Sequence, residues 1–225
     1  MNPMCTTPVP ARAFHAGVSF RSCIPGPTSG LLRRMNPRVV LLRHGATEWS
    51  LSGQHTGRTD IPLVDLGCQQ AVAAGELLRG MTFARVLTSP LQRALTTCGL
   101  AGFEGQLCPD LVEWDYGAYE GLTSAEIRAE RPGWTLWTDG VVGGESPADV
   151  GRRVDRVIEQ ARQAPGDTLC VAHGHVLRVL AARWLDLPPV AGRLLALATG
   201  TVSVLGWERD VPVVERWNVS PDGLP

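Results

Sequence analysis

The sequence predicts a three-layer α/β/α domain built on a mostly parallel β-sheet with an antiparallel edge. From residue 38 onward, short apolar runs typical of buried strands alternate with segments of helical periodicity. This alternation favours parallel strands joined by helices that cover both faces of the sheet. The last two apolar runs are separated only by a short charged turn, which predicts the antiparallel edge. With 225 residues, 44% of them hydrophobic, the chain is long enough for one such domain.

The first elements follow from local patterns. Residues 38–42 form an apolar run that predicts a buried strand, and residues 83–87 predict a second, shorter one. Between them, Asp65 is placed to cap a helix that runs to about Arg79. This strand–helix–strand order is the unit from which a parallel sheet is built.

Serine and threonine residues mark the starts of the next helices. Ser89 and the following proline predict an N-cap with proline at the first helical position, opening a helix to about Leu100. Residues 123–126 form a capping box. Ser146, with a proline after it and Asp149 in the first turn, predicts another helix. Its apolar face comprises Val150, Val154, Val157, Ile158 and Ala161. Its solvated face is predicted to carry Arg152, Arg153 and Arg156.

The C-terminal half repeats the alternation and then ends in two strands. Residues 168–172 predict a buried strand, and residues 175–185 predict a helix that a Leu-Pro-Pro sequence stops. Residues 201–207 and 211–217 predict two strands around the charged turn at 208–210. No internal repeat or linker interrupts this pattern, so we predict one domain over residues 36–225.

Residues 1–35 differ in composition from the rest of the chain. They contain five prolines and four arginines, no acidic residue, and no helical or strand periodicity. We predict a disordered N-terminal extension, with Met35 as the first functional residue. The alternative interpretation is a transit peptide, because such leaders are rich in arginine and serine and poor in acidic residues.

The composition excludes several classes of function. All 21 basic residues are arginine, so P-loop, Schiff-base and other lysine-dependent mechanisms are excluded. The net charge of −1 gives no support for a nucleic-acid or membrane partner, and no apolar run has the length of a membrane span. The six cysteines form no CxxC pair, which predicts a reduced cytoplasmic protein.

Two of the predicted strands end in a His-Gly pair. Arg43 and His44 follow the first strand, and His173 follows the strand over 168–172 and precedes a helix. In open α/β sheets, ligands bind outside the carboxyl ends of the strands, and a helix N-terminus there offers N–H groups to an anion. Helical side chains lean toward the N-terminus, so Arg93 is expected to point to the same edge. We therefore predict that these four groups meet around an anion.

The chemistry of phosphoryl transfer matches these residue types. Two arginines and one imidazole suit the equatorial oxygens of a phosphoryl group, and a second, neutral imidazole is a competent nucleophile. The leaving oxygen then needs a general acid. The loop over 111–121 offers Glu113, Asp115 and Glu120, and spacing alone does not choose among them.

Five segments of the chain, in order, resemble the signatures of the histidine phosphatase superfamily, which includes the cofactor-dependent phosphoglycerate mutases. The first, RHGATEW, resembles the RHGxTxW signature of that family. They lie at residues 43–49, 57–63, 88–94, 113–121 and 173–174. The resemblance covers residues 36 to about 217 and implies a phosphoglycerate mutase-like fold.

The resemblance also implies roles for individual residues. His44 would be the nucleophile that becomes phosphohistidine, and Glu113 matches the proton donor of the family. Phosphoryl oxygens would be bound by Arg43, Arg93 and His173. Substrate-pocket positions are matched by Ser50, Thr56, Gly57 and Tyr116, to which we add Gly174 and Arg58. Residues Arg58 and His55 are expected near the pocket mouth, where a second phosphate or a sugar hydroxyl would lie.

Departures from the mutases favour hydrolysis. Mutases of the family carry a lysine shortly after the Tyr-Gly motif, whereas this chain has Leu-Thr-Ser-Ala at 122–125 and no lysine. We therefore predict a phosphoric monoester hydrolase of the histidine acid phosphatase type, a phosphomonoesterase acting on small phosphorylated metabolites such as sugar phosphates. The alternatives are a phosphoglycerate mutase and a non-catalytic phosphate-binding module.

The predicted enzyme uses no cofactor and no metal, and it is a monomer or homodimer. His173 and His175 resemble a metal-binding pair, but ligands at zinc spacing are missing beside them. Trp134 and Trp137 are interpreted as packing and lid residues.

Overall fold

The computed structural model describes residues 36–220, so the predicted extension over residues 1–35 lies outside the described residues. The elements, in chain order, are β1 (Val39–Arg43), α1 (Glu48–Ser52), α2 (Asp65–Leu77), β2 (Arg85–Thr88), α3 (Gln92–Leu100), β3 (Gln106–Leu107), η1 (Pro109–Leu111), η2 (Gly117–Tyr119), α4 (Ser124–Glu130), α5 (Leu136–Asp139), α6 (Pro147–Arg162), β4 (Thr168–Ala172), α7 (Gly174–Trp184), η3 (Pro189–Leu194), β5 (Val202–Glu208) and β6 (Val211–Val219).

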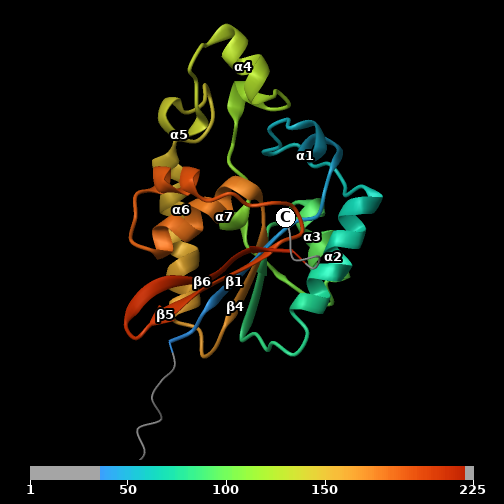
Figure 1. The fold of residues 1–225 in the computed structure, drawn as a ribbon, viewed down its shortest axis with the longest axis vertical. Coiled ribbons are helices and arrows are strands. Elements are labelled where there is room, and N and C mark those ends of the chain that lie inside the picture. The colour runs from blue at the N-terminus through green and yellow to red at the C-terminus, as the bar shows by residue number, and fades with distance from the viewer. Residues whose placement is uncertain (1–35, 221–225) are drawn as a thin grey trace, which may run out of the picture. The chain divides into compact units, whose positions relative to one another are not determined.

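The strands form one mixed sheet in the order β3-β2-β4-β1-β5-β6 (Figure 1). Strands β3, β2, β4 and β1 are parallel to their neighbours, whereas β5 runs antiparallel to β1, and β6 antiparallel to β5. The predicted fold class is therefore confirmed, including the antiparallel edge.

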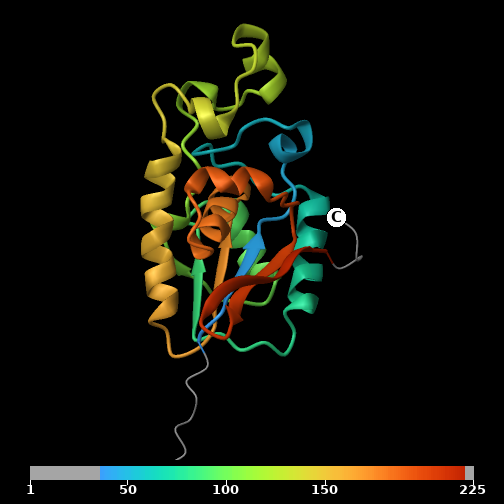
Figure 2. The same cartoon turned by 60° about the vertical axis from the view of Figure 1, so that its left-hand side comes forward.

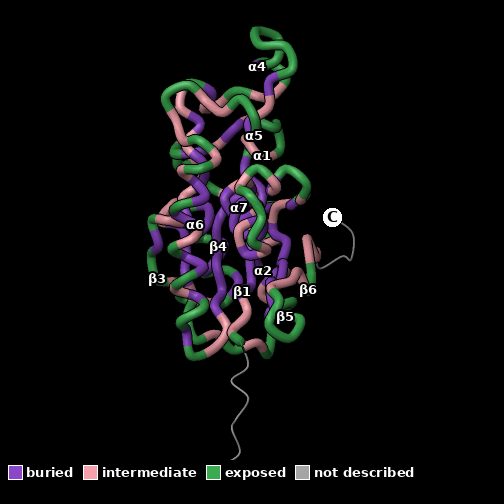
Figure 3. The backbone as a smooth tube through the Cα atoms, turned by 90° about the vertical axis from the view of Figure 1, so that its left-hand side faces the viewer, coloured by how far each residue is buried: buried purple, intermediate pink, exposed green. Residues whose placement is uncertain are grey.

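Alternation along β1 shows how the sheet divides the core. Val39 and Leu41 belong to the cluster packed with α6 and α7, whereas Val40 and Leu42 belong to the cluster packed with α2 and α3. Helices thus cover both faces, as Figure 2 shows. Strand β4 is buried along its whole length, which is why it reads as a continuous apolar run (Figure 3).

Two predicted helix starts are confirmed and two are wrong. Capping boxes open α4 at Thr123 and α6 at Ser146. Asp65, however, is the first residue of α2, not its cap, and α3 begins only at Gln92. Ser89 is not the N-cap of α3, because residues 90 and 91 are not helical. Its hydroxyl oxygen lies 2.7 Å from the ring of His173 and also accepts from the N–H of Leu91 at 3.4 Å.

The prediction that Arg153 is solvated is also wrong. Its guanidinium is buried, forms an ion pair with Glu145 and donates to the carbonyl groups of Asp110 and Val112. Helical spacing alone does not show that a loop folds over this edge of α6. The predicted apolar face of α6 is buried as expected.

The carboxyl ends of β1 and β4 lie side by side. Arg43 pairs with Ala172 in the register of the two strands, so the residues that follow each strand are neighbours. Helices α1, α4 and α5 lie beyond this edge of the sheet (Figures 1 and 2). Within residues 36–220, no helix has the length and apolar character needed to cross a membrane.

Candidate active site

The two imidazole rings that follow β1 and β4 lie next to each other. The His44 N–H donates to the carbonyl of Ala172 at 2.9 Å, which fixes the end of β1 against the end of β4. The ring centroids of His44 and His173 are 5.1 Å apart, with an interplanar angle of 60°. The strand register thus brings together two histidines that are 129 positions apart in the sequence.

The His44 ring is held as a neutral imidazole with its Nε2 nitrogen unprotonated. Its Nδ1 lies 2.7 Å from the carbonyl oxygen of Gly45, and because a carbonyl only accepts, Nδ1 must carry the hydrogen. Burial, together with the positive charges of Arg43 and Arg93, holds the pKa of His44 well below its usual range. The lone pair of Nε2 is therefore available to attack an electrophile.

Glycine after His44 is required by close packing. A Cβ at Gly45 would lie 2.1 Å from the carbonyl oxygen of Gly67 in α2, which no side chain tolerates. The Gly45 N–H donates to Oγ1 of Thr97 in α3 at 3.1 Å. The turn after β1 is thus packed between α2 and α3, which fixes the backbone position from which the His44 side chain extends.

Arg93 is fully buried and almost completely engaged by the protein. Its Nε donates to Nδ1 of His173 at 3.0 Å. Its Nη1 and Nη2 donate to three carbonyl groups, those of Thr59, Thr56 and Gly57. One N–H of the five, on Nη1, has no partner among residues 36–220.

His173 is held by partners on both ring nitrogens. A guanidinium only donates, so Nδ1 accepts from Arg93 and Nε2 carries the hydrogen, which goes to Oγ of Ser89. Burial, followed by the charge of Arg93, holds the pKa of His173 well below its usual range, so the ring is neutral. A contact with a phosphoryl oxygen requires the Nε2 hydrogen to leave Ser89. From the sequence, Ser89 was predicted only as a helix cap.

Arg43 faces the N-terminus of α7. Its Nη1 donates to the carbonyl of Leu197, and its buried Nε has no hydrogen-bond partner in the described part of the chain. A Cβ at Gly174 would come within 3.2 Å of the Arg43 guanidinium carbon, so glycine there lets the arginine approach the helix. Gly174 therefore acts on the site through its lack of a side chain.

Glu113 is anchored by three backbone N–H groups. Its Oε1 accepts from Trp114 and Val176, and its Oε2 accepts from His175, with distances of 2.8–2.9 Å. Two of these donors belong to the first turn of α7, a favourable place for a carboxylate. The rival carboxylates are engaged elsewhere: Asp115 binds Arg58, and Glu120 binds the N–H groups of Gly57 and Thr59.

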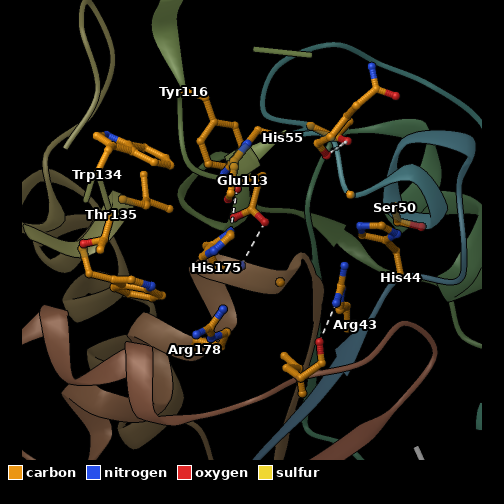
Figure 4. A pocket seen from close by; sticks show the side chains of 18 of the residues that line it. Arg43, His44, Ser50, His55, Glu113, Tyr116, Trp134, Thr135, His175 and Arg178 are labelled. Atoms are coloured by element: carbon orange, nitrogen blue, oxygen red, sulfur yellow. Dashed lines mark hydrogen bonds between the residues drawn. The ribbon is translucent and has the colours of Figure 1, made fainter. Parts of the chain in front are cut away.

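A cavity of about 270 Å³ opens over these groups (Figure 4). Among its lining residues are the candidates Arg43, His44, Ser50, His55, Thr56, Glu113, Tyr116 and Gly174. Arg93 and His173 are completely buried and do not line it. Gly57 and Arg58 do not line it either, and the Arg58 side chain is 70% exposed.

The cavity is also lined by residues that were not predicted from the sequence. Most lie in the segment over 124–137 and on α7, and the full set is Gly53, Gln54, Ser124, Arg128, Thr135, Leu136, Arg178 and Leu197. Trp134 and Trp137, interpreted as packing or lid residues, are buried and line the same cavity. Helical spacing was an available signal for Arg178, because it follows Gly174 by four residues.

No group of three or more His, Cys, Asp or Glu side chains within residues 36–220 is arranged to hold a metal ion. The charged side chains that line the cavity are three arginines and Glu113. This lining is suited to an anionic ligand.

Comparisons with known proteins agree with this geometry. A family model described as the histidine phosphatase superfamily (branch 1) matches residues 39–220. The chain is 42% identical over 181 residues to an acid phosphatase from Mycobacterium tuberculosis, covering 78% of this chain and 89% of the relative. It is 36% identical over 188 residues to sedoheptulose 1,7-bisphosphatase from Saccharomyces cerevisiae, covering 68% of this chain and 69% of the relative.

Solved structures show the same similarity. The structure of an open reading frame product from Mycobacterium tuberculosis superimposes with a TM-score of 0.80 at 40% identity, covering 83% of this chain and 99% of that one. A mycobacterial glucosyl-3-phosphoglycerate phosphatase superimposes with a TM-score of 0.73 at 31% identity, covering 82% of this chain and 100% of that one.

Proposed function

The chain belongs to the histidine phosphatase superfamily, and from this premise we propose that it is a phosphomonoesterase that hydrolyses small phosphorylated metabolites, such as sugar phosphates, through a phosphohistidine at His44. The observation that carries the proposal is the neutral His44 ring, with Nε2 unprotonated beside two arginines. Three of the similar proteins are named as phosphatases or bisphosphatases, which supports the same reaction class.

The first step transfers the phosphoryl group to the enzyme. The Nε2 lone pair of His44 attacks phosphorus, and the bond from phosphorus to the ester oxygen breaks. Arg43 and the remaining N–H of Arg93 stabilise the charge on the equatorial oxygens. Glu113 lines the same cavity and reacts in its protonated form, delivering its proton to the leaving oxygen, which departs as an alcohol.

The second step returns the enzyme to its starting state. Glu113, now a carboxylate, takes a proton from a water molecule that attacks the phosphohistidine. The bond between phosphorus and Nε2 breaks, inorganic phosphate leaves, and the His44 ring is neutral again. Each cycle therefore consumes one water and needs no bound cofactor.

The reaction class is tested with 3-phosphoglycerate and para-nitrophenyl phosphate. We expect release of inorganic phosphate from both compounds, because the chain contains no lysine to retain a bisphosphate intermediate as the mutases do. Formation of 2-phosphoglycerate, followed by NMR, would identify a mutase instead. If neither compound nor a panel of sugar phosphates releases phosphate at acidic or neutral pH, the chain is a binding module.

Glu113→Gln is expected to slow the hydrolysis of alkyl phosphate esters far more than that of aryl phosphate esters. An alkoxide needs a proton to leave, so the general acid contributes about 10²–10⁴-fold there, whereas nitrophenolate leaves with little help. The kcat values for glycerol 3-phosphate and para-nitrophenyl phosphate measure the difference. Glu120→Gln is the matched control, because the amide oxygen keeps both N–H contacts of a residue outside the cavity lining. Equal slowing of both esters by Glu113→Gln contradicts the role.

A further inference from the structure

Arg178 lies further along the helix that begins at the site. Gly174, His175 and Arg178 all line the cavity from α7, and residues three and four apart share one face of a helix. Four residues rise about 6 Å along a helix axis. Arg178 therefore faces the same cavity as Arg43. Arg43 lies against the N-terminal end of α7, and Arg178 lies roughly one helical turn further along the helix.

The cavity carries positive charge that the protein does not neutralise. Arg43, Arg128 and Arg178 line it, and none of them forms an ion pair within residues 36–220. Glu113 also lines it, but both of its oxygens accept from backbone N–H groups. Of the fourteen other arginines within residues 36–220, eight form ion pairs, and these are Arg38, Arg58, Arg79, Arg152, Arg153, Arg156, Arg183 and Arg209.

The Arg178 guanidinium is held in place by neutral partners. It stacks over the ring of Trp137 at 4.7 Å, and its Nε donates to the carbonyl of Gly192 at 3.1 Å. Its Nη1 makes no hydrogen bond within residues 36–220. Burial lowers the pKa of Arg178, and the charge of Glu113 opposes that change. A half-buried, rigid cation without a counter-ion is suited to receive an anion.

We propose that Arg178 forms a second anion site in the cavity and that the substrate carries a second anionic group, a phosphate or a carboxylate, besides the phosphoryl group transferred to His44. This inference rests on the proposed function and narrows its substrate class. Arg128 is exposed, and its Nε donates to the carbonyl of Trp134, so it adds charge at the edge of the same cavity. The ring of Trp137 stacks against the Arg178 guanidinium and fixes its position.

Matched substrate pairs test the proposal. Glycerol 3-phosphate and 3-phosphoglycerate share the reacting primary ester and differ by a carboxylate. Fructose 1,6-bisphosphate differs from each fructose monophosphate by one phosphate. The wild-type enzyme is expected to prefer the doubly anionic member of at least one pair by tenfold or more in kcat/KM, and the pair that shows the preference identifies carboxylate or phosphate.

Arg178→Met is expected to abolish that preference. A hydrogen-bonded charge contact corresponds to about 10- to 100-fold in affinity, so the loss should appear mainly as a higher KM for the doubly anionic substrate. Arg178→Lys, which keeps the charge without the planar fork, should retain part of the preference. Arg162→Met is the matched control, since Arg162 also stacks on a tryptophan, Trp184, but does not line the cavity.

The outcomes separate the two proposals. Equal efficiency of the wild type on both members of both pairs overturns the second anion site while leaving the phosphatase in place. Equal loss on both members in Arg178→Met, or the same change in Arg162→Met, also overturns it, because the effect is then structural. Wild-type enzyme that releases phosphate from no substrate overturns the proposed function itself.

Discussion

Replacing His44 with asparagine is expected to lower kcat at least about a thousandfold while leaving thermal stability close to that of the wild type. The Asn amide nitrogen occupies the position of Nδ1 and can still donate to the Gly45 carbonyl. It provides nothing at the position of Nε2, so no phosphoryl acceptor remains. Turnover of para-nitrophenyl phosphate and the midpoint of thermal unfolding measure the two effects.

The comparison with His44→Ala separates chemistry from structure. Alanine removes Nε2 and also the Nδ1 hydrogen bond, so it should lose activity to the same extent and about 1 kcal/mol more stability. Rapid quenching with ³²P-labelled substrate should trap an acid-labile, base-stable protein adduct in the wild type and none in either variant. An Asn variant that keeps more than a tenth of the wild-type turnover, or that still becomes labelled, would exclude His44 as the nucleophile.

Arg93→Met is expected to lose both activity and stability. The change leaves the carbonyl groups of Thr56, Gly57 and Thr59 and the Nδ1 of His173 without their buried donor. At about 1 kcal/mol for each group, the free energy of unfolding should fall by roughly 3–4 kcal/mol. Activity should fall by about a thousandfold, since an N–H and a positive charge beside the phosphoryl group are lost. Urea unfolding and kcat/KM measure the two losses.

Arg153→Met is the matched control for Arg93. It removes another buried arginine that donates to two carbonyl groups and to Glu145, but unlike Arg93 it makes no hydrogen bond to His173. We expect a comparable loss of stability with less than a tenfold change in kcat/KM. If Arg93→Met behaves in the same way, Arg93 is a structural residue only and the proposed clamp on the phosphoryl group is wrong.

Elements with local causes were predictable from the sequence. The capping boxes at Thr123 and Ser146 form because donor and acceptor are three residues apart. Strand β4 was predictable because burial on both faces leaves a continuous apolar run. The prediction of Ser89 as the N-cap was wrong because the helix begins only at Gln92, and the Ser89 hydroxyl contacts the distant imidazole of His173 as well as the N–H of Leu91.

The site was only partly predictable. His44 and His173 share a recognisable context, a strand followed by His-Gly, and the sheet rules place them at one edge. The residues alone left three carboxylates open, and the family resemblance selected Glu113. In the structure Glu113 is the one of the three that lines the cavity, held by the first turn of α7. Arg178 carries no motif. Its four-residue spacing from Gly174 places it on the same helix face, and the cavity distinguishes it from a surface arginine.

By itself, the sequence determined the layers of the fold, the order of its elements and the two histidines at the ends of parallel strands. Periodicity and helix caps act over a few residues, so they can be read from a short segment. Only the tertiary structure decided which ring nitrogen of each imidazole carries the hydrogen and where each arginine points. Those properties depend on partners such as Arg93 and Ser89, which lie 80 and 84 positions from His173. Long-range packing brings such partners together, and no local pattern encodes it.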